Sequence, residues 1–454
     1  MTLIEQLAEF VAGVGIADVP QGTCDTLRLH LFDTLSATLI GTTSPEAQAV
    51  AGLVADTGAA GDVPVAGLAT RTAPPLAALL GCVATRCTEI DDIDLLSCTT
   101  PGSVVVPSGL ALSHADAPHA QDFLAALLAG YEVLTRFGQA VEGPSILYRG
   151  VWPTYLAAPL GAAATASRLL GLPAEATAHA LAAAVTLISS TSGRARAPSS
   201  RWLTVGCAAQ NGLLAALGAR RGLRGDLSLL DGAWSQTSGI ALDGEALVRD
   251  LGDPLAIERI SIKPYCAAKQ VTSSIAALVG LLDDGAAELA AVERVVVAVP
   301  PAYARMIDQP APLPERLGGI VSAQYQLALA AYHRDELLDV LRPIQHQEPA
   351  FRAFMQRVQV VAEPSLAAEY PLAWPARVTI EAASGEATRE VRHTAGDPGH
   401  AFTWDDALAK ARRALRDVAA PAAVERLART CRGLGAGAAL ADLWAALAPS
   451  QPTA

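Results

Sequence analysis

The segment that decides the fold is Ile257-Glu258-Arg259-Ile260-Ser261-Ile262-Lys263-Pro264-Tyr265, because the character of the sequence changes across it. Before this segment, apolar residues recur at helical spacing, as in the series Leu27, Leu31, Leu35 and Leu39. From Ile257 to Ile262, apolar and polar residues alternate in the manner of a β-strand. The segment therefore predicts the point at which a helical domain gives way to a domain that contains a sheet.

Further alternating segments lie downstream, with helical segments between them. Strands are predicted at residues 292–299, 358–362, 377–382 and 386–392, and helices at residues 268–283, 319–333 and 348–356. Helical spacing returns from Trp404 onward. We therefore predict a mainly α protein, in which both ends of the chain, residues 1–262 and 399–454, build a large all-helical domain. Residues 263–398 are expected to form a smaller α+β lid domain.

The composition excludes several classes of protein. The chain has 454 residues, of which 51% are hydrophobic, so disorder is excluded. Its basic residues are three lysines and 30 arginines, its net charge is −12, and no basic run points to nucleic acid. No apolar stretch reaches the ~18–20 residues of a membrane helix, and the first residues do not resemble a signal peptide. The seven cysteines form no CxxC pair. We expect a cytoplasmic protein without membrane or nucleic-acid partners.

Four carboxylates lie within six residues at the end of a predicted apolar helix: Glu89, Asp91, Asp92 and Asp94. Three interpretations are open. A crowded carboxylate is suited to general acid or base catalysis, the group as a whole is suited to a divalent metal ion, and the end of a helix is often simply solvated. The spacing is not that of an EF-hand and no histidine is near, so no metal site is predicted.

A second cluster surrounds Arg201, which is expected just before a helix over residues 203–221. A helix start favours anions, and an arginine there can bind a carboxylate in a bidentate manner. The alternative is an ordinary surface arginine. Downstream, Gly206, Ala209 and Gly212 recur at one-turn spacing, which predicts close approach of a neighbouring backbone.

Two of the three lysines, Lys263 and Lys269, fall within seven positions of each other where the second domain begins. Either could bind a carboxylate or, when desolvated, act as a base, although a solvated lysine is the common case. The eight histidines show no ligand spacing and lie outside these clusters in the sequence. No nucleotide-binding motif and no nucleophile elbow occur, so no cofactor is predicted.

Short motifs spread along the chain carry a family resemblance. They are Asp33-Thr34-Leu35 with Gly41, Glu89-Ile90-Asp91-Asp92, Pro101-Gly102-Ser103-Val104-Val105-Val106-Pro107, Gly130-Tyr131-Glu132-Val133 with Arg136, Leu169-Leu170-Gly171-Leu172, Gly206-Cys207-Ala208-Ala209 with Gly212, Ile262-Lys263-Pro264-Tyr265, and Ser322-Ala323-Gln324-Tyr325. In this order they resemble the MmgE/PrpD family, which includes 2-methylcitrate dehydratase, cis-aconitate decarboxylase and iminodisuccinate epimerase. The resemblance implies a large helical domain made from both chain ends, an α+β lid, and a homodimer.

The resemblance also implies proton transfer beside a carboxylate, without a metal or nucleotide cofactor. In the family, histidines carry the protons, supported by an acidic residue, a lysine and a tyrosine. This sequence departs from that pattern: Glu89 replaces the expected aspartate, Thr100, Trp152 and Thr272 stand where histidines are expected, Arg201 replaces the lysine, and Tyr325 is retained. Threonine and tryptophan do not titrate near neutral pH, so changed chemistry is expected. The ring of Trp152 suggests a substrate with an apolar portion.

The resulting candidates for proton transfer are Glu89, Asp91, Lys269 and Tyr325. The candidates for substrate binding are Thr100, Trp152, Arg201, Lys263, Gln270 and Thr272. We predict a cofactor-independent lyase or isomerase that acts by elimination, epimerisation or cyclisation. Its expected substrate is a polar or carboxylate-bearing small molecule, and its expected role is in secondary metabolism. Two alternatives remain: a dehydratase or decarboxylase of a small di- or tricarboxylate, and a non-catalytic binding relative.

Overall fold

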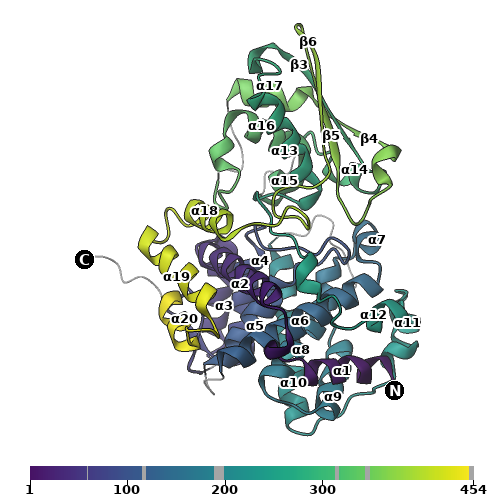
Figure 1. Ribbon diagram of the computed structural model, residues 1–454, viewed down its shortest axis with the longest axis vertical. Helices are drawn as coiled ribbons and strands as arrows, with labels where there is room; N and C mark the ends of the chain where they lie inside the picture. Colours follow the sequence, from purple (N-terminus) through teal and green to yellow (C-terminus); the bar gives the residue numbers. More distant parts are fainter. Residues whose placement is uncertain (59, 115–118, 189–198, 312–315, 343–347, 449–454) are drawn as a thin grey trace. The chain divides into compact units, whose positions relative to one another are not determined.

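The computed structural model describes residues 1–58, 60–114, 119–188, 199–311, 316–342 and 348–448 (Figure 1). The chain divides into two compact units: a helical unit, Met1–Ile260 with Thr403–Ala454, and a sheet unit, Ser261–Phe402. The predicted boundaries lie after Ile262 and Pro398, whereas the units change at Ile260 and Phe402.

In its described residues, the helical unit contains helices and one short two-stranded ladder. Its helices are α1 (Leu3–Gly13), α2 (Gln21–Gly41), α3 (Pro45–Asp56), α4 (Pro74–Arg86), α5 (Gly102–Ser113), α6 (Ala120–Ala140), α7 (Gly143–Tyr148), α8 (Pro153–Leu169), α9 (Ala174–Thr186), α10 (Ser200–Arg220), α11 (Ala233–Ser238), α12 (Gly244–Val248), α18 (Trp404–Ala414), α19 (Pro421–Gly433) and α20 (Leu440–Leu447). The ladder pairs β1 (Val63–Pro64) with β2 (Arg71–Thr72).

Small residues let the central helices of this unit pack closely. A Cβ atom at Gly206 of α10 would lie 2.9 Å from the carbonyl oxygen of Leu79 in α4. A Cβ atom at Gly212 would lie 2.4 Å from the carbonyl oxygen of Pro159 in α8. The close approach predicted from the glycine spacing is therefore confirmed on two sides of α10.

The last three helices return to the first part of the chain. In Figure 1, α18 and α19 lie beside α2, and both helices contact α2. Helix α18 begins at a capping box, in which the Thr403 side chain accepts from the Asp406 amide and the Asp406 carboxylate accepts from the Thr403 amide. Such a box satisfies two amide groups that a helix start leaves unpaired, so it fixes the point at which the chain re-enters the helical unit.

The sheet unit contains a four-stranded sheet of order β4-β3-β5-β6. Its elements are α13 (Lys269–Asp283), β3 (Val292–Val299), α14 (Pro301–Ile307), α15 (Arg316–Val321), α16 (Ala323–Tyr332), α17 (Pro349–Arg357), β4 (Val358–Ala362), β5 (Ala376–Ala382) and β6 (Gly385–Val391). Strands β3 and β4 run parallel, and the β3–β5 and β5–β6 pairs are antiparallel. Helix α13 packs on β5 and β6 and also contacts α16.

The mainly α class is confirmed, and so are the four predicted strands of the sheet, within a residue at their ends. The strand predicted over Ile257–Ile262 is wrong, because residues 256–259 form a 3₁₀ helix. The helix predicted over residues 319–333 is interrupted at Ser322, whose side chain caps α16 by accepting from the Tyr325 amide. No helix in the described part of the chain is long and apolar enough to cross a membrane.

Candidate active site

The acidic segment, defined as Glu89–Asp94, is buried. Asp91, Asp92 and Asp94 have no exposed surface, and Glu89 is only 6% exposed. A carboxylate can be buried only if it is paired with a charge or hydrogen-bonded. The solvated helix end that the sequence allowed is therefore wrong, and each of these carboxylates has a partner.

Arg86, in the last turn of α4, pairs with two of these carboxylates. Its Nη1 atom lies 3.0 Å from Oε2 of Glu89 and 3.2 Å from Oδ1 of Asp91. Burial opposes the charge of Arg86, but Asp91 and Glu89 outweigh it and raise the arginine pKa above its ordinary value. The pairing brings the two predicted proton-transfer carboxylates of this unit to one guanidinium.

Two tryptophans hold Arg86 and Arg201. The guanidinium carbon of Arg86 lies 4.3 Å from the ring centre of Trp152 and 5.4 Å from that of Trp202. The guanidinium carbon of Arg201 lies 4.5 Å and 4.7 Å from the same two rings. These distances are typical of cation–π contacts. The two arginines, with Trp152 and Trp202, are called the arginine–tryptophan cluster below.

Arg201 is the second residue of α10. The sequence had suggested a position just before the helix, and that prediction is wrong. Its backbone carbonyl accepts a hydrogen bond of 3.2 Å from the Tyr155 hydroxyl. The Tyr155 ring in turn packs against Trp152 with ring centres 4.9 Å apart. Arg201 is 8% exposed, so the ordinary surface arginine is wrong as well.

Thr100 lies in the segment just before α5 and contacts Thr154 of α8. Its amide donates to Oγ1 of Thr154, 3.3 Å away, and the two hydroxyl oxygens are 3.4 Å apart. Its carbonyl accepts from the Ser103 hydroxyl. Thr100 therefore belongs to a buried hydroxyl cluster at the start of α5.

Asp92, the third carboxylate of the acidic segment, has a different set of partners. Oδ2 of Asp92 lies 3.2 Å from Nδ1 of His30 and accepts a hydrogen bond of 2.9 Å from the Tyr131 hydroxyl. Its other oxygen accepts from the Gly102 amide. Burial and the Asp92 charge raise the pKa of Tyr131 well above its ordinary value, so the phenol stays a donor. The fourth carboxylate, Asp94, pairs with Arg259 at 3.2 Å.

In the sheet unit, Lys269 begins α13 and forms a buried ion pair with Asp397. Its Nζ atom also donates to the Thr394 hydroxyl at 2.8 Å. Burial lowers the pKa of Lys269, while the Asp397 charge acts in the opposite direction and Lys263 lowers the pKa further. An ammonium with a lowered pKa is more easily deprotonated, which is the property required of a lysine base.

The other predicted residues of this segment are also buried. Lys263, Gln270 and Thr272 are each at most 4% exposed. The Thr272 hydroxyl donates to the Lys269 carbonyl at 2.8 Å, one turn back in the helix. Its donor is thus used within α13, and only its oxygen lone pairs remain to accept a hydrogen bond.

Tyr325 lies in the first turn of α16, next to Arg342. The guanidinium carbon of Arg342 is 6.0 Å from the Tyr325 ring centre, and its Nη2 atom donates to the Cys266 carbonyl at 2.7 Å. Burial raises the pKa of Tyr325, with Arg342 acting in the opposite direction. A phenol with a raised pKa remains protonated at neutral pH and is suited to donate a proton.

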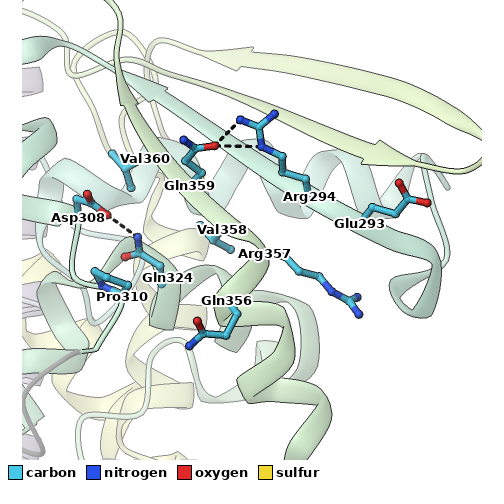
Figure 2. Close-up of a pocket in the computed structure, with 10 residues that line it drawn as sticks. All are labelled: Glu293, Arg294, Asp308, Pro310, Gln324, Gln356, Arg357, Val358, Gln359 and Val360. Carbon is cyan, nitrogen blue, oxygen red and sulfur yellow. Dashed lines mark hydrogen bonds between the residues drawn. The ribbon is translucent and has the colours of Figure 1, made fainter.

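The sheet unit also has an open pocket of about 500 Å³ beside the edge strand β4 (Figure 2). Its lining is Glu293, Arg294, Asp308, Pro310, Gln324, Gln356, Arg357, Val358, Gln359 and Val360. The polar groups largely pair with each other, since Gln324 donates to Asp308 and Arg294 to Gln359. None of the residues predicted from the sequence lines it, so we do not assign it as the active site.

The described residues contain no group of three or more histidine, cysteine, aspartate or glutamate side chains able to hold a metal ion. Several partners of the predicted residues, and of Asp92 beside them, were not predicted: Arg86, Trp202, His30, Tyr131, Asp397 and Arg342. A signal existed for Arg86, which lies three residues before Glu89 at the end of a predicted helix. No comparable signal existed for His30 or Asp397, whose partners are distant in the sequence.

Comparison with known proteins matches this chain to one family along most of its length. Residues 5–244 match the MmgE/PrpD N-terminal domain, and residues 265–434 match the MmgE/PrpD C-terminal domain. The cis-aconitate decarboxylase-like protein oryM of Aspergillus oryzae is 28% identical over 233 residues, which are 50% of this chain and 48% of that protein. A cis-aconitate decarboxylase of Aspergillus terreus is 25% identical over 224 residues, which are 48% of this chain and 45% of that protein. The matched region thus spans about half the length of these relatives. The chain belongs to the MmgE/PrpD family.

Proposed function

We propose that this protein is a cofactor-independent lyase or isomerase that transfers a proton beside a carboxylate group of a small molecule. In this proposal Arg201 anchors the substrate carboxylate, and Glu89 or Asp91 serves as the base. Lys269 and Tyr325 are the further groups able to exchange a proton. Thr100, Trp152, Lys263, Gln270 and Thr272 are proposed to contribute to binding. The proposal includes a homodimeric, cytoplasmic enzyme of secondary metabolism.

The observation that carries the proposal is the arginine–tryptophan cluster next to Glu89 and Asp91. Buried guanidinium groups bind carboxylates strongly, because little water competes for them. An ion pair with Arg86 favours a charged carboxylate, and the charged form is the one that a general base requires. An anchor for an anion and a base therefore occur within one group of contacts.

The same cluster supports a substrate that also has an apolar or planar portion. Trp152 and Trp202 provide ring surface beside the guanidinium groups, with ring centres 5.9 Å apart. A tricarboxylate offers no counterpart to such rings. We therefore propose one carboxylate on an otherwise apolar or unsaturated skeleton as the substrate class.

Proton exchange with deuterated water tests the proposal. The purified protein, after dialysis against EDTA, is incubated in D₂O with single carboxylates of this class, and NMR follows loss of the C–H signal. Glu89→Gln is expected to lower the exchange rate by a factor of about 10² or more, as for loss of a general base. Glu142→Gln is a matched control, because Glu142 also has a positive φ angle but is exposed. Exchange at the wild-type rate in Glu89→Gln would exclude Glu89 as the base.

The comparisons favour a second candidate, decarboxylation or dehydration of a small di- or tricarboxylate. Both relatives carry cis-aconitate decarboxylase in their names. Incubation with cis-aconitate and with 2-methylcitrate distinguishes the two candidates, since turnover of either compound rejects the first. Binding of carboxylates without exchange or turnover of any compound would instead identify a non-catalytic relative.

A further inference from the structure

Lys410 connects the returning helix α18 to the acidic segment. Its Nζ atom donates a hydrogen bond of 2.7 Å to the Ile90 carbonyl and lies 2.8 Å from Oδ1 of Asp33 in α2. All three residues are buried. The ammonium therefore makes two contacts at once, one with a carboxylate and one with the backbone between Glu89 and Asp91.

The backbone at this point adopts a conformation that needs support. Glu89 has a φ angle of 59°, in the left-handed region that residues other than glycine rarely occupy. Such a conformation persists only where the surroundings determine it. The Ile90 amide donates to the Thr88 hydroxyl at 3.3 Å, and the Ile90 carbonyl accepts from Lys410. Residue 90 is thus held at both its amide and its carbonyl.

We propose that Lys410 is a positioning residue, which fixes the carboxylates of Glu89 and Asp91 in front of Arg86 by holding the carbonyl between them. This proposal rests on the proposed function, in which those carboxylates supply the base. A lysine is suited to the task because its ammonium is a compact point charge with three donors. The chain otherwise uses arginine for 30 of its 33 basic residues, so a lysine here is a departure from its own composition.

The competing explanation is that Lys410 merely balances the buried charge of Asp33. A pair of variants separates the two. Lys410→Met removes the ammonium and leaves Asp33 buried without its cation, so loss of stability alone is uninformative. The double variant Asp33→Leu/Lys410→Met removes both charged groups, adds no new donor, and leaves the Ile90 carbonyl without its ammonium. Arg412→Met, on the exposed face of the same helix, is the control.

Hydrogen exchange measured by mass spectrometry, without any ligand, is the first readout. Amide exchange in a peptide covering residues 88–94 is expected to be about tenfold faster in Lys410→Met and in the double variant, because a charge-assisted hydrogen bond is lost. Arg412→Met should match the wild type. Wild-type protection of this peptide in the double variant would overturn the proposal, since Lys410 would then serve Asp33 alone.

The second readout is proton exchange from a substrate identified as described above. In the double variant kcat should fall about tenfold with little change in KM, because the base is displaced while the anchor at Arg201 remains. If Glu89→Gln is inactive and the double variant keeps the wild-type kcat, the positioning role is wrong and the proposed function stands. Full activity in Glu89→Gln excludes Glu89 as the base and leaves Asp91 in that role. If the wild-type protein exchanges no substrate proton, the proposed function fails, and the hydrogen exchange of residues 88–94 still decides whether Lys410 holds the segment.

Discussion

At the scale of single residues, the three lysines of the chain are its most selectively placed side chains. Lys263, Lys269 and Lys410 are 1%, 2% and 6% exposed. Exposed ion pairs in the described residues use arginine instead, as in Arg294 with Glu381. Since lysine is usually a surface residue, its restriction to buried positions indicates that each ammonium has a specific structural or chemical role.

A first prediction follows from this burial. Treatment of the native protein with a small acylating reagent, followed by peptide mass spectrometry, should leave all three lysines unmodified. Unfolding in guanidinium before acylation should modify all three, because reactivity requires access to the reagent. Rapid acylation of Lys269 in the native state would show that its pairing with Asp397 opens readily.

A second prediction concerns Arg201. Arg201→Ala should weaken binding of the substrate carboxylate by roughly 2–5 kcal/mol, as expected for loss of a desolvated charge partner. Arg220→Ala, at the exposed end of the same helix, should leave the affinity unchanged. The dissociation constant measured by titration calorimetry checks both variants. An unaltered affinity in Arg201→Ala would make this arginine purely structural.

The sequence identified the residues of the acidic segment but could not decide their environment. The four carboxylates looked alike in the sequence, yet Glu89 and Asp91 pair with Arg86, Asp92 with His30, and Asp94 with Arg259. The last two of these assignments depend on tertiary contacts that spacing does not encode. Burial of charge is a property of the folded chain, so sequence patterns alone could not distinguish a solvated helix end from a packed cluster.

At the scale of elements, helix packing was predictable and the domain-boundary strand was not. Glycine spacing in α10 predicted close approach, and Gly206 and Gly212 contact two different helices. The wrong strand has a simple cause: Ile257 and Ile260 are three residues apart, so one 3₁₀ turn buries both. Alternation over a short stretch is compatible with either element, and a strand also requires a partner strand.

The third prediction tests helix packing through glycine. Gly212→Ala should destabilise the protein by about 1–3 kcal/mol, because the added methyl group would meet the α8 backbone. Gly52→Ala in α3 should instead stabilise it by about 0.5–1 kcal/mol, because no atom lies within 4 Å of the added Cβ. Urea unfolding followed by circular dichroism measures both. Equal effects of the two substitutions would contradict the packing described for α10.

At the scale of the whole molecule, each unit contains a buried lysine–aspartate pair that joins two segments distant in the sequence. Asp33 and Lys410 join the two separate parts of the helical unit. Lys269 and Asp397 join the first helix of the sheet unit to a turn near its end. The family resemblance and the change from helical spacing to alternating residues predicted a helical domain made from both chain ends. Neither predicted these two ion pairs, because each pair depends on a contact between distant segments.

The fourth prediction concerns pH. Burial raises the pKa of Asp397, but the charge of Lys269 and the hydrogen bonds from Lys269, Thr394 and Ser261 together lower it below its ordinary value. As the pH falls, Asp397 therefore binds a proton in the unfolded chain at a higher pH than in the native protein. The stabilisation that the charged carboxylate provides is complete above about pH 4 and is lost as the pH falls further. Asp397→Asn should cost about 3–5 kcal/mol at pH 7, since it leaves Lys269 buried without its carboxylate.

Chemical denaturation of wild type and Asp397→Asn between pH 7 and pH 3 checks this prediction. The difference in unfolding free energy between the two proteins should shrink as the pH falls below about 4. A difference that stays constant over this range would show that the pKa of Asp397 is the same in the native and the unfolded protein, so that its pairing with Lys269 does not lower it.

The pairing of α18 with the acidic segment also has a consequence for biosynthesis. The ribosome synthesises Ile90 320 residues before the lysine that holds its carbonyl. Throughout that interval the nascent chain has made the carboxylates but not the ammonium, and the entire sheet unit is translated in between. The part of the acidic segment around Ile90 can therefore reach its final form only after α18 leaves the exit tunnel, whereas the sheet unit already has all of its parts.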